Sequence, residues 1–419
     1  MTASRRVVIC GSGVVGLSCA YFLLERGHRV VVVERGGPDR DCCSLGNAGF
    51  LSPSHFVPLA APGIVGKAVQ WMGNPESPFY VRPRFDPELL SWGWQFWRAS
   101  DRERARKAAP LLRDLNLASR ALYQELARST QNDFGLTLEG LLMLVRTKRG
   151  LEEETRLAER CRELGMPAHV LDAAGVAALE PDVTLDVLGG VHYPLDAHLR
   201  PQAFVAALAR LVRERGGEFV WNAELREWRR EGDVVRAAIT SDGEVGGDEF
   251  VVAAGSWTPL LCRSLGLRLP MQPGKGYSMT LDAPRQLPRH CFILQEARVA
   301  VTPMGRELRV GGTMELAGYD LTINPPRIRG LTRSFTTYFP AFRMEDFQGV
   351  TPWCGLRPCT PDGLPYVGRA PRWRNVTIAA GHAMMGMSEG PITGKVVSEI
   401  LSGRTPSIDV AALDPGRYG

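Results

Sequence analysis

A glycine-rich turn near the N-terminus is the feature that most constrains how this chain folds. The segment RVVICGSGVVGL, residues 6–17, sets a run rich in β-branched residues directly before Gly11, Gly13 and Gly16. Apolar residues then recur at helical spacing, and a second apolar run, residues 30–33, ends in the acid Glu34. This order predicts a strand, a glycine turn, a helix and a second strand.

Each glycine of this turn has a physical role. Gly11 permits the tight turn, Gly13 lets the backbone approach a diphosphate, and Gly16 lets the helix pack closely on the strand. The helix N-terminus offers unpaired N–H groups and a partial positive charge to phosphates, and Glu34 is placed to bind a ribose diol. We therefore predict a dinucleotide-binding site, although this element alone does not separate NAD from FAD.

Further strands of the same sheet are predicted in the middle and at the end of the chain. Residues 249–254 form an apolar strand that enters a small-residue turn, and residues 376–380 precede a glycine turn and a helix over 388–401. We therefore predict an α/β plus α+β protein, in which a discontinuous Rossmann-like cofactor domain contains an inserted mixed-sheet substrate domain. The expected boundaries are 1–55, 196–265 and 350–419 for the cofactor domain, and 56–195 and 266–349 for the substrate domain.

The regions between these strands also carry local signals. Helices are predicted over 104–127, 151–164 and 201–215, and strands over 218–221, 234–240, 277–281, 298–302 and 307–310. Residues 53–97 are rich in proline and aromatic side chains, and we assign no element to them.

Composition excludes several classes of protein. The 419 residues are 44% hydrophobic, and the apolar run at residues 7–10 is too short for a signal peptide or for a span of about 18 residues. The net charge of +5 is small and dispersed, which disfavours a nucleic-acid partner. Nine cysteines, with Cys10 and Cys19 at packing positions, favour reduced thiols, and their spacing indicates no metal site. We expect a cytoplasmic protein.

Several long motifs, in order, resemble one enzyme family. They are GSGVVGL at Gly11, GNAGFLSP at Gly46, GKGYSMTL at Gly274, RVGGTMELAGYD at Arg309, GLRPCTPDGLPYVGR at Gly355 and AAGHAMMG at Ala379. Together they resemble the D-amino-acid oxidase superfamily of FAD-dependent amine oxidoreductases, and most closely the bacterial D-amino-acid dehydrogenases. The segments PSHFVPLAAPG at Pro53 and NPESPFY are similar to the branch that acts on cyclic D-imino acids such as cis-4-hydroxy-D-proline.

The resemblance implies a flavoprotein whose cofactor is FAD. It assigns the diphosphate to the glycine turn and the adenosine side to Glu34 and Arg35 with the backbone of Leu225. It assigns the flavin to residues 44–49 and 381–388, and residues 254–257 to a second cofactor turn. Cys354 lies one position out of register with the cysteine that attaches flavin in sarcosine-oxidase-like relatives, which favours noncovalent FAD. The cofactor-binding residues implied are Gly11, Ser12, Gly13, Val14, Val15, Gly16, Glu34, Arg35, Ser44, Asn47, Ala48, Gly49, Leu225, Ala254, Gly255, Trp257, Gly381, His382, Met384, Met385, Gly386, Met387 and Ser388.

Oxidising an amine at its α-carbon requires a grip on the substrate carboxylate. Arg357 is the candidate, because a guanidinium forms a bidentate pair with a carboxylate and the matching family arginine does so. His55 is a candidate base or pocket residue, and Tyr277 orients the substrate or packs in the core. Ala383 stands where the family more often has glycine, so a positive φ there would be strained. Arg298 replaces an aromatic residue of related dehydrogenases and reshapes the expected pocket.

The resemblance implies oxidation of a small or cyclic D-amino acid, such as cis-4-hydroxy-D-proline or D-proline, in amino-acid catabolism. Hydride would pass from the α-carbon to flavin N5, and electrons then to a quinone-like acceptor other than oxygen. One alternative is a peroxide-forming D-amino-acid or sarcosine-type oxidase. Another is a noncatalytic scaffold that FAD only stabilises.

An aromatic segment bears on where the electrons go. Eight aromatic residues lie between Trp71 and Trp97, and the basic run RERARK follows at 102–107. In one interpretation these residues bind the inner face of the membrane, where the protein would lie peripherally. In the other, Trp92 and Phe96 face the core at i, i+4, and the basic run is a solvated helix face.

Overall fold

The computed structural model describes residues 4–418 and confirms the predicted N-terminal unit. β1 (Arg6–Cys10), α1 (Val14–Glu25) and β2 (Arg29–Val33) follow in order, with β1 and β2 parallel. Gly27 adopts a φ of +82° just beyond α1, where a left-handed residue ends a helix. The first unit is therefore the βαβ start of a nucleotide-binding sheet.

The first sheet has six strands in the order β19-β20-β13-β1-β2-β9. Neighbouring strands are parallel except β19, which runs antiparallel to β20 at one edge. Its strands come from separated parts of the chain, as the discontinuous Rossmann-like fold class requires. The remaining members are β9 (Glu218–Val220), β13 (Glu249–Val252), β19 (Tyr366–Arg369) and β20 (Val376–Ala380).

Alternate residues of the central strands face two different cores. Val7 and Ile9 pack with one group of helices, and Val8 and Cys10 pack on the other face, because successive side chains of a strand point to opposite sides. The first core includes α4 (Arg102–Ser129), α7 (Pro201–Glu214) and α10 (Gly386–Leu401). The second includes the three-stranded sheet of β10 (Leu225–Glu231), β11 (Val234–Thr240) and β12 (Gly243–Gly246), with η1 (Gly255–Trp257) and α8 (Thr258–Arg263) beside it.

The second large sheet has nine strands in the order β18-β14-β17-β16-β15-β5-β7-β6, with β4 pairing β17. α9 (Pro325–Tyr338) packs on one face through Leu331 and Phe335, and α5 (Lys148–Glu163) packs on the other face through Ala158. The strands are β4 (Phe79–Val81), β5 (Leu141–Val145), β6 (His169–Asp172), β7 (Gly189–Tyr193), β14 (Gln272–Leu281), β15 (Cys291–Leu294), β16 (Val299–Met304), β17 (Glu307–Leu316) and β18 (Trp353–Cys359).

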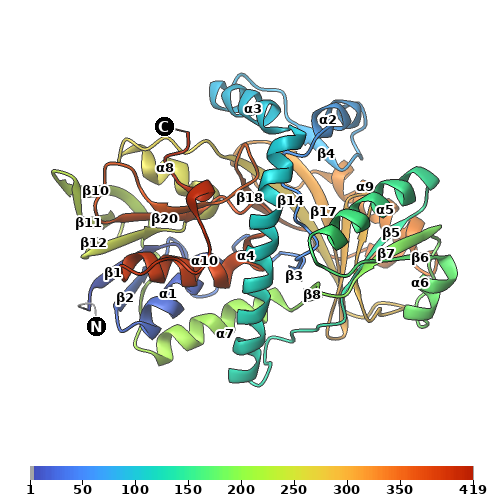
Figure 1. The fold of residues 1–419 in the computed structure, drawn as a ribbon, viewed down its shortest axis with the longest axis horizontal. Helices are drawn as coiled ribbons and strands as arrows, with labels where there is room; N and C mark the ends of the chain where they lie inside the picture. The colour runs from blue at the N-terminus through green and yellow to red at the C-terminus, as the bar shows by residue number, and fades with distance from the viewer. Residues whose placement is uncertain (1–3, 419) are drawn as a thin grey trace.

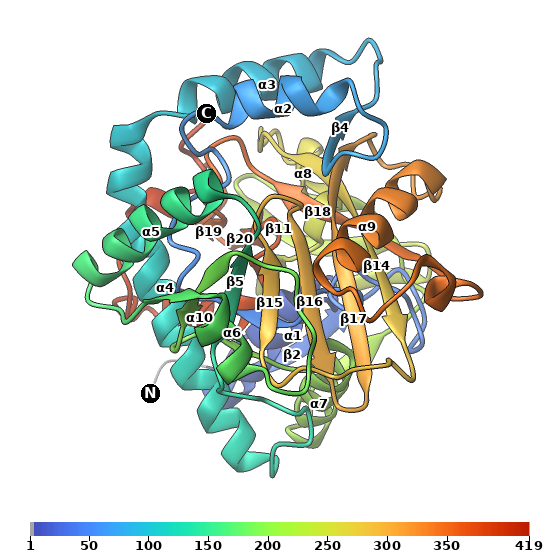
Figure 2. The same ribbon diagram turned by 90° about the vertical axis from the view of Figure 1, so that its right-hand side faces the viewer.

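The two large sheets form two halves of the molecule, and α4 runs between them (Figure 1). α4 contributes Leu112 and Tyr123 to the core of the first sheet and Ala109 to a core of the second. α2 (Ile64–Met72) and α3 (Pro87–Ala99) lie together at one end of the molecule, outside both sheets (Figures 1 and 2). The other elements are β3 (Phe50–Leu51), β8 (Ala197–His198), α6 (Ala173–Leu179), η2 (Met344–Phe347) and η3 (Ala411–Leu413).

Three details differ from the sequence-based expectation. β18 lies in the nine-stranded sheet, paired antiparallel with β14, although residues from 350 onward were assigned to the cofactor domain. α4 packs mainly in the core of the six-stranded sheet, although it was assigned to the substrate domain. Residues 53–97, where no element was predicted, form α2, β4 and α3. The first two differences are tertiary contacts, which leave no periodic signal within the local sequence. The start of α3 did carry a signal, since Asp86 caps the helix and Pro87 occupies its first turn.

No helix within residues 4–418 combines the length and the apolar character needed to cross a membrane.

Candidate active site

The glycine turn between β1 and α1 has the close contacts that its sequence predicts. Gly11 has a φ of +109°, and a Cβ at this position would lie 2.5 Å from the Ala253 carbonyl oxygen. A Cβ on Gly16 would lie 2.0 Å from the Gly11 carbonyl oxygen. Because these contacts involve backbone atoms that cannot swing aside, neither position accommodates a side chain.

The N-terminus of α1 is open to a ligand. Its N-cap, Gly13, supplies no side-chain cap, and the Val14 N–H donates to the Ser44 hydroxyl at 3.1 Å. The Ser44 contact brings the segment that was predicted to run along the flavin to the turn predicted to hold the diphosphate. Unpaired N–H groups at a helix N-terminus bind phosphate.

Glu34 is bonded to the turn from the end of β2. Its carboxylate accepts hydrogen bonds from the Ser12 N–H at 2.9 Å, the Ser12 hydroxyl at 2.6 Å and the Gly36 N–H at 3.1 Å. Arg40, which the sequence analysis missed, donates to the Ser12 carbonyl and lies 3.6 Å from Glu34. The Arg40 Nε is buried and has no hydrogen-bond partner among residues 4–418. Arg40 therefore adds a cation at the turn, from an irregular loop that carries no motif.

Residues expected on the adenosine side also come together. The Arg35 guanidinium lies 3.7 Å from the ring centroid of Trp257, which follows β13. The Ala223 N–H donates to the Glu34 carbonyl, so the connection that leads to Leu225 runs beside Glu34. Gly255 has a φ of +55° in the small-residue turn.

The segment 44–49 connects the first sheet to the second. Thr302 on β16 donates to the Ala48 carbonyl at 2.7 Å. Arg309 on β17, another residue that the sequence analysis did not select, donates to the carbonyls of Leu45 and Asn47 at 2.9 and 2.8 Å. Burial lowers the pKa of Arg309 to about 10. These bonds fix the predicted flavin segment on the face of the second sheet that carries Thr302 and Arg309.

The C-terminal glycine turn lies against the same segment. The Asn47 side-chain amide donates to the Met384 carbonyl at 3.3 Å. Ala383 has a φ of +47°, so the strained conformation foreseen for an alanine at this position is present. His382 is buried against the Thr393 hydroxyl at 2.9 Å, and burial lowers its pKa to about 3. The His382 side chain is therefore occupied by Thr393, and only its backbone is available to the site.

The helix that follows this turn is adapted around a proline. Pro391 lies inside α10 and has no N–H, which frees the Met387 carbonyl, and the Tyr123 hydroxyl donates to that carbonyl instead. Ser388 donates to Asn116 on α4 and accepts from the Ser52 N–H. The start of α10, with Met385 as N-cap and Gly386 as its first residue, is thereby held in place.

Arg357 is the most informative side chain of the site. A Cβ on Gly276 would lie 2.2 Å from its Nη2, so the guanidinium lies directly over the Gly276 backbone. Its Nη1 donates to the Thr313 carbonyl at 2.6 Å, and its Nη2 meets the Gly312 carbonyl at 3.5 Å. Among residues 4–418, no carboxylate oxygen lies within 4.0 Å of its nitrogens. Burial lowers the pKa of Arg357, and the nearby thiols of Cys43 and Cys359 oppose that shift.

The sheet face around Arg357 carries small side chains. Arg357 pairs with Gly274, and residues paired directly across a sheet share a face. The same face continues through Gly276 and Ser278 on β14, Gly311 on β17 and Ala300 on β16. Thr302 and Arg309, which hold the segment 44–49, are paired on this face as well. The face can therefore accept a small anionic ligand beside the predicted flavin segment.

Tyr277 does not join Arg357. It is adjacent to Gly276 on β14, so its side chain lies on the opposite face, where it pairs with Cys354 and Gly312. Its hydroxyl donates to Glu315 at 2.7 Å, and burial together with this bond raises its pKa. This position argues against the substrate-orienting role and favours core packing, the alternative drawn from the alternating strand.

Cys354 shares the face of Tyr277. Its thiol donates to the Leu321 carbonyl at 3.0 Å. The thiol is therefore directed away from the face that carries Arg357, which argues for noncovalent FAD.

His55 lies in a loop that Asp196 anchors. The Ser54 N–H and hydroxyl donate to Asp196 at 3.0 and 2.6 Å, and burial raises the pKa of Asp196 to about 7. Burial and the positive charge of Arg298 lower the pKa of His55 to about 4. The His55 ring is therefore neutral near pH 7, and the charge of Arg298, the residue expected to reshape the pocket, reaches it.

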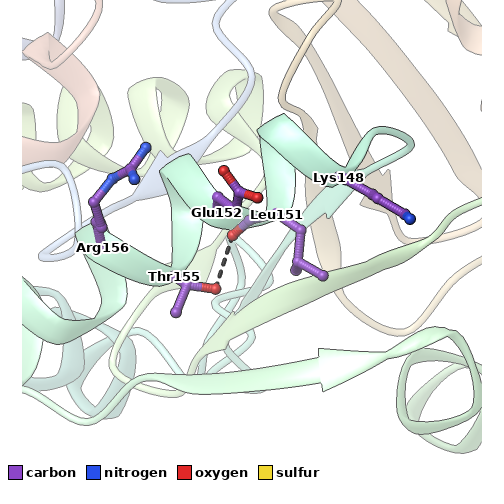
Figure 3. A pocket seen from close by; sticks show the side chains of 5 residues that line it. All are labelled: Lys148, Leu151, Glu152, Thr155 and Arg156. Carbon is purple, nitrogen blue, oxygen red and sulfur yellow. Dashed lines mark hydrogen bonds between the residues drawn. The ribbon is translucent and has the colours of Figure 1, made fainter.

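A hollow of about 420 Å³ lies elsewhere, on α5 (Figure 3). Lys148, Leu151, Glu152, Thr155 and Arg156 line it, and the Thr155 hydroxyl donates to the Leu151 carbonyl within the same helix. All five residues belong to the surface of one helix, and none contributes to the cradle described above.

The cradle fits FAD. A helix N-terminus whose N-cap residue supplies no side chain, two glycines that exclude a side chain and a buried arginine nitrogen without a hydrogen-bond partner suit a diphosphate. The segment 44–49, bonded to both the glycine turn and the sheet face of Arg357, is placed to follow the rest of the cofactor.

Comparisons with known proteins give the same result. The sequence family described as DAO, FAD dependent oxidoreductase, matches residues 6–400. The chain is 36% identical to a D-amino acid dehydrogenase of Granulibacter bethesdensis and 35% identical to one of Paramagnetospirillum magneticum, in each case over 99% of both chains.

Solved structures share the fold. A glycine oxidase from Geobacillus kaustophilus superposes with a TM-score of 0.78 and 24% identity, covering 99% of both chains. An L-proline dehydrogenase from P. horikoshii superposes with a TM-score of 0.74 and 19% identity, covering 100% of this chain and 98% of the other.

Proposed function

From the premise that this chain belongs to the DAO family of FAD-dependent oxidoreductases, we propose that it is a D-amino-acid dehydrogenase acting on a small or cyclic substrate. The names of the full-length relatives support the activity. The observation that carries the proposal is Arg357, a half-buried cation without a carboxylate partner among residues 4–418, on a face of small side chains beside the predicted flavin segment.

Arg357 binds the substrate carboxylate in this proposal. Two of its N–H groups are directed to the Thr313 and Gly312 carbonyls, which fixes the plane of the guanidinium before the substrate arrives. The remaining N–H groups are free to form a bidentate pair with a carboxylate. A fixed carboxylate orients the α-carbon, so that Arg357 acts as a positioning clamp.

FAD, when bound, supplies the hydride acceptor for the α-carbon. Gly11, Gly16, Glu34 and Arg40 would hold its ADP half, and residues 44–49 with 381–388 would lie along the remainder. The start of α10 offers the positive end of a helix dipole where negative charge develops on reduction.

Small side chains favour a small or cyclic substrate. Gly276, Ser278, Gly311 and Ala300 leave room on the Arg357 face, and Arg298 is close enough to His55 for its charge to lower the pKa of that ring. Loss of hydride from a neutral amine leaves an iminium ion, which releases its proton to water, so no general base at the α-carbon is required. Cis-4-hydroxy-D-proline and D-proline would give cyclic imines, and open-chain substrates would give imines that water hydrolyses to oxo acids.

The acceptor is proposed to be quinone-like and to approach from a membrane. The α2–α3 end of the molecule exposes large apolar side chains beside the basic run at 102–107. The exposed fractions are 93% for Phe85, 65% for Val69, 64% for Leu90, 59% for Trp94 and 56% for Trp97. Such aromatic and aliphatic groups next to cations suit the interface of an anionic bilayer.

The same segment also contains core residues. Trp92 is buried and stacks on Phe96 at 4.9 Å, as the core interpretation expects. Trp92 also lines a cavity of about 340 Å³ between α3 and residues 266–272, and its Nε1 donates to the Cys359 carbonyl on β18. Trp92 thus lines the cavity and also bonds to the strand that carries Arg357, and we propose the cavity as the approach for the acceptor.

Two experiments test these proposals. Steady-state turnover of D-amino acids should reduce an artificial dye and release little peroxide; predominant peroxide release would favour the oxidase alternative. Flotation with anionic liposomes should capture the protein at low salt, and Trp94→Ser with Trp97→Ser should release it, whereas the exposed-residue control Leu188→Ser should not. Absence of flotation at low salt would reject the membrane contact.

A further inference from the structure

Thr313 has a backbone conformation that a β-branched residue rarely adopts. Its φ is +60°, in the left-handed region that favours glycine and asparagine. It lies in a bulge of β17, since Tyr277 pairs with Gly312 and Lys275 pairs with Glu315, which leaves Thr313 and Met314 opposite Gly276 alone. Strain and bulges of this kind collect at ligand sites.

The bulge has an evident purpose for the backbone. It directs the Thr313 carbonyl to the Arg357 Nη1 at 2.6 Å. Any residue supplies a carbonyl, and glycine would supply it without strain. The bond to Arg357 therefore explains the bulge and leaves the choice of threonine unexplained.

The threonine hydroxyl is unused within the protein. Thr313 is 6% exposed, and its Oγ1 is buried with no hydrogen-bond partner among residues 4–418. A buried hydroxyl without a partner is costly, and a site built with one gains that bond when its ligand binds. Thr313 lies opposite Gly276, over whose backbone the Arg357 guanidinium lies, and its carbonyl accepts from that guanidinium, so the free hydroxyl belongs to a neighbour of the cation.

We propose that Thr313 is a substrate-binding residue whose hydroxyl donates a hydrogen bond to the substrate carboxylate bound by Arg357. This inference rests on the proposed function. Thr313 acts twice on the same anion: its carbonyl orients Arg357, and its hydroxyl adds a third hydrogen bond to the bidentate pair.

Three substitutions separate the hydroxyl from the backbone. Thr313→Ser keeps the hydroxyl, Thr313→Val removes it with similar volume, and Thr313→Gly removes it while relieving the positive φ. Thr377→Val is the matched control, because Thr377 on β20 in the other sheet is also fully buried and its Oγ1 also has no partner among the described residues. FAD content and thermal unfolding of each holoenzyme show whether the variant is folded.

The readouts are KM, kcat and the inhibition constant of acetate, a carboxylate without an amine. Loss of one hydrogen bond to a carboxylate should raise KM and the acetate constant about tenfold in Thr313→Val and Thr313→Gly, with kcat within about twofold. Thr313→Ser and Thr377→Val should stay near wild type. Thr313→Gly should unfold at a higher temperature than Thr313→Val.

Two results would overturn the proposal. One is an unchanged KM and acetate constant in folded Thr313→Gly; the other is an increase in Thr313→Ser equal to that in Thr313→Val. Arg357→Ala, measured in parallel, separates a failure of the Thr313 role from a failure of the proposed function. If it raises KM while Thr313→Gly does not, only the role of Thr313 fails, and if neither has an effect, the proposed function fails.

Discussion

Replacement of Arg357 by alanine or lysine tests the proposed carboxylate clamp. A guanidinium has about five N–H groups. Two of them face the Thr313 and Gly312 carbonyls, which leaves the others for a carboxylate. Removing one partner of a buried, hydrogen-bonded charge pair costs about 2–5 kcal/mol, and about 1.4 kcal/mol is a factor of ten. We therefore expect Arg357→Ala to lower kcat/KM by about 30-fold to 4,000-fold.

The loss should appear mainly in KM, because the carboxylate is bound in both the ground state and the transition state. Arg357→Lys keeps the charge but loses the planar fork, so its kcat/KM should fall by about 10-fold to 100-fold. The assay is dye reduction at varied substrate concentration, normalised to bound FAD. For a substrate analogue with a carboxamide in place of the carboxylate, kcat/KM should fall much less from wild type to Arg357→Ala.

Arg327→Met is the control for general damage. Arg327 is 2% exposed and donates to the Ser77 carbonyl, but it lies on α9, which packs against the other face of the second sheet. This variant should lose stability and keep its KM. A folded, FAD-loaded Arg357→Ala with an unchanged KM would refute the clamp, as would equal losses for the carboxylate and the carboxamide.

Three further predictions concern the cradle and its surroundings. Gly16→Ala places a Cβ about 2.0 Å from the Gly11 carbonyl oxygen, so the purified variant should lose FAD, seen as a lower ratio of flavin to protein absorbance; full retention would refute the close-packing argument. The pKa of His55 is lowered from 6.5 to about 4, so any stability it contributes is complete above 6.5 and is lost as pH falls toward 4. His55→Asn should thus flatten the pH dependence of the unfolding free energy, measured with urea, only in that window. It should leave kcat/KM unchanged between about pH 7 and 9; loss of an ionisation from the kcat/KM profile in that range would show that His55 titrates during turnover. Ala383→Gly should raise the unfolding free energy by up to about 1 kcal/mol, since it relieves a φ of +47°, and a lower urea midpoint would contradict the strain.

The ADP half of the site could be predicted from the sequence because its chemistry is local. Gly11, Gly16 and Glu34 lie within one βαβ unit, and the contacts of Gly16 and Glu34 stay inside it, whereas the Gly11 contact reaches out to Ala253. Cys10 and Cys19 are buried in the cores as their positions predict. The glycine pattern therefore contains most of the information about this part of the fold.

The other half depends on contacts between distant strands. Arg309 opens the RVGGTMELAGYD motif, but its partners Leu45 and Asn47 lie far away in the sequence and nothing in the motif identifies them. In the ADP half, Arg40 likewise reaches Ser12 from an irregular loop that carries no motif. The strand pattern of β14 did indicate alternation, but it could not show which face carries the ligand. That choice separates Tyr277 from Arg357, and it follows from the pairing of β14 with β18.

The glycines of the GKG motif, residues 274–276, could have indicated which face of β14 carries the ligand. Gly276 admits the Arg357 guanidinium, and any side chain there would collide with it. Similarly, the GGT motif marks the bulge at Thr313. Both motifs were used only as family resemblance, whereas their physical cause is the close approach of Arg357 to the backbone of two strands.

The most direct test of the central claim is anaerobic reduction of the bound flavin by paired enantiomers. The FAD-loaded protein is mixed, without oxygen or dye, with D-proline or L-proline and with D-alanine or L-alanine, and the loss of flavin absorbance is followed. The proposed function predicts that the D-enantiomers bleach the flavin and that the L-enantiomers do so far more slowly. Bleaching by neither series, or at equal rates by both enantiomers, would contradict it.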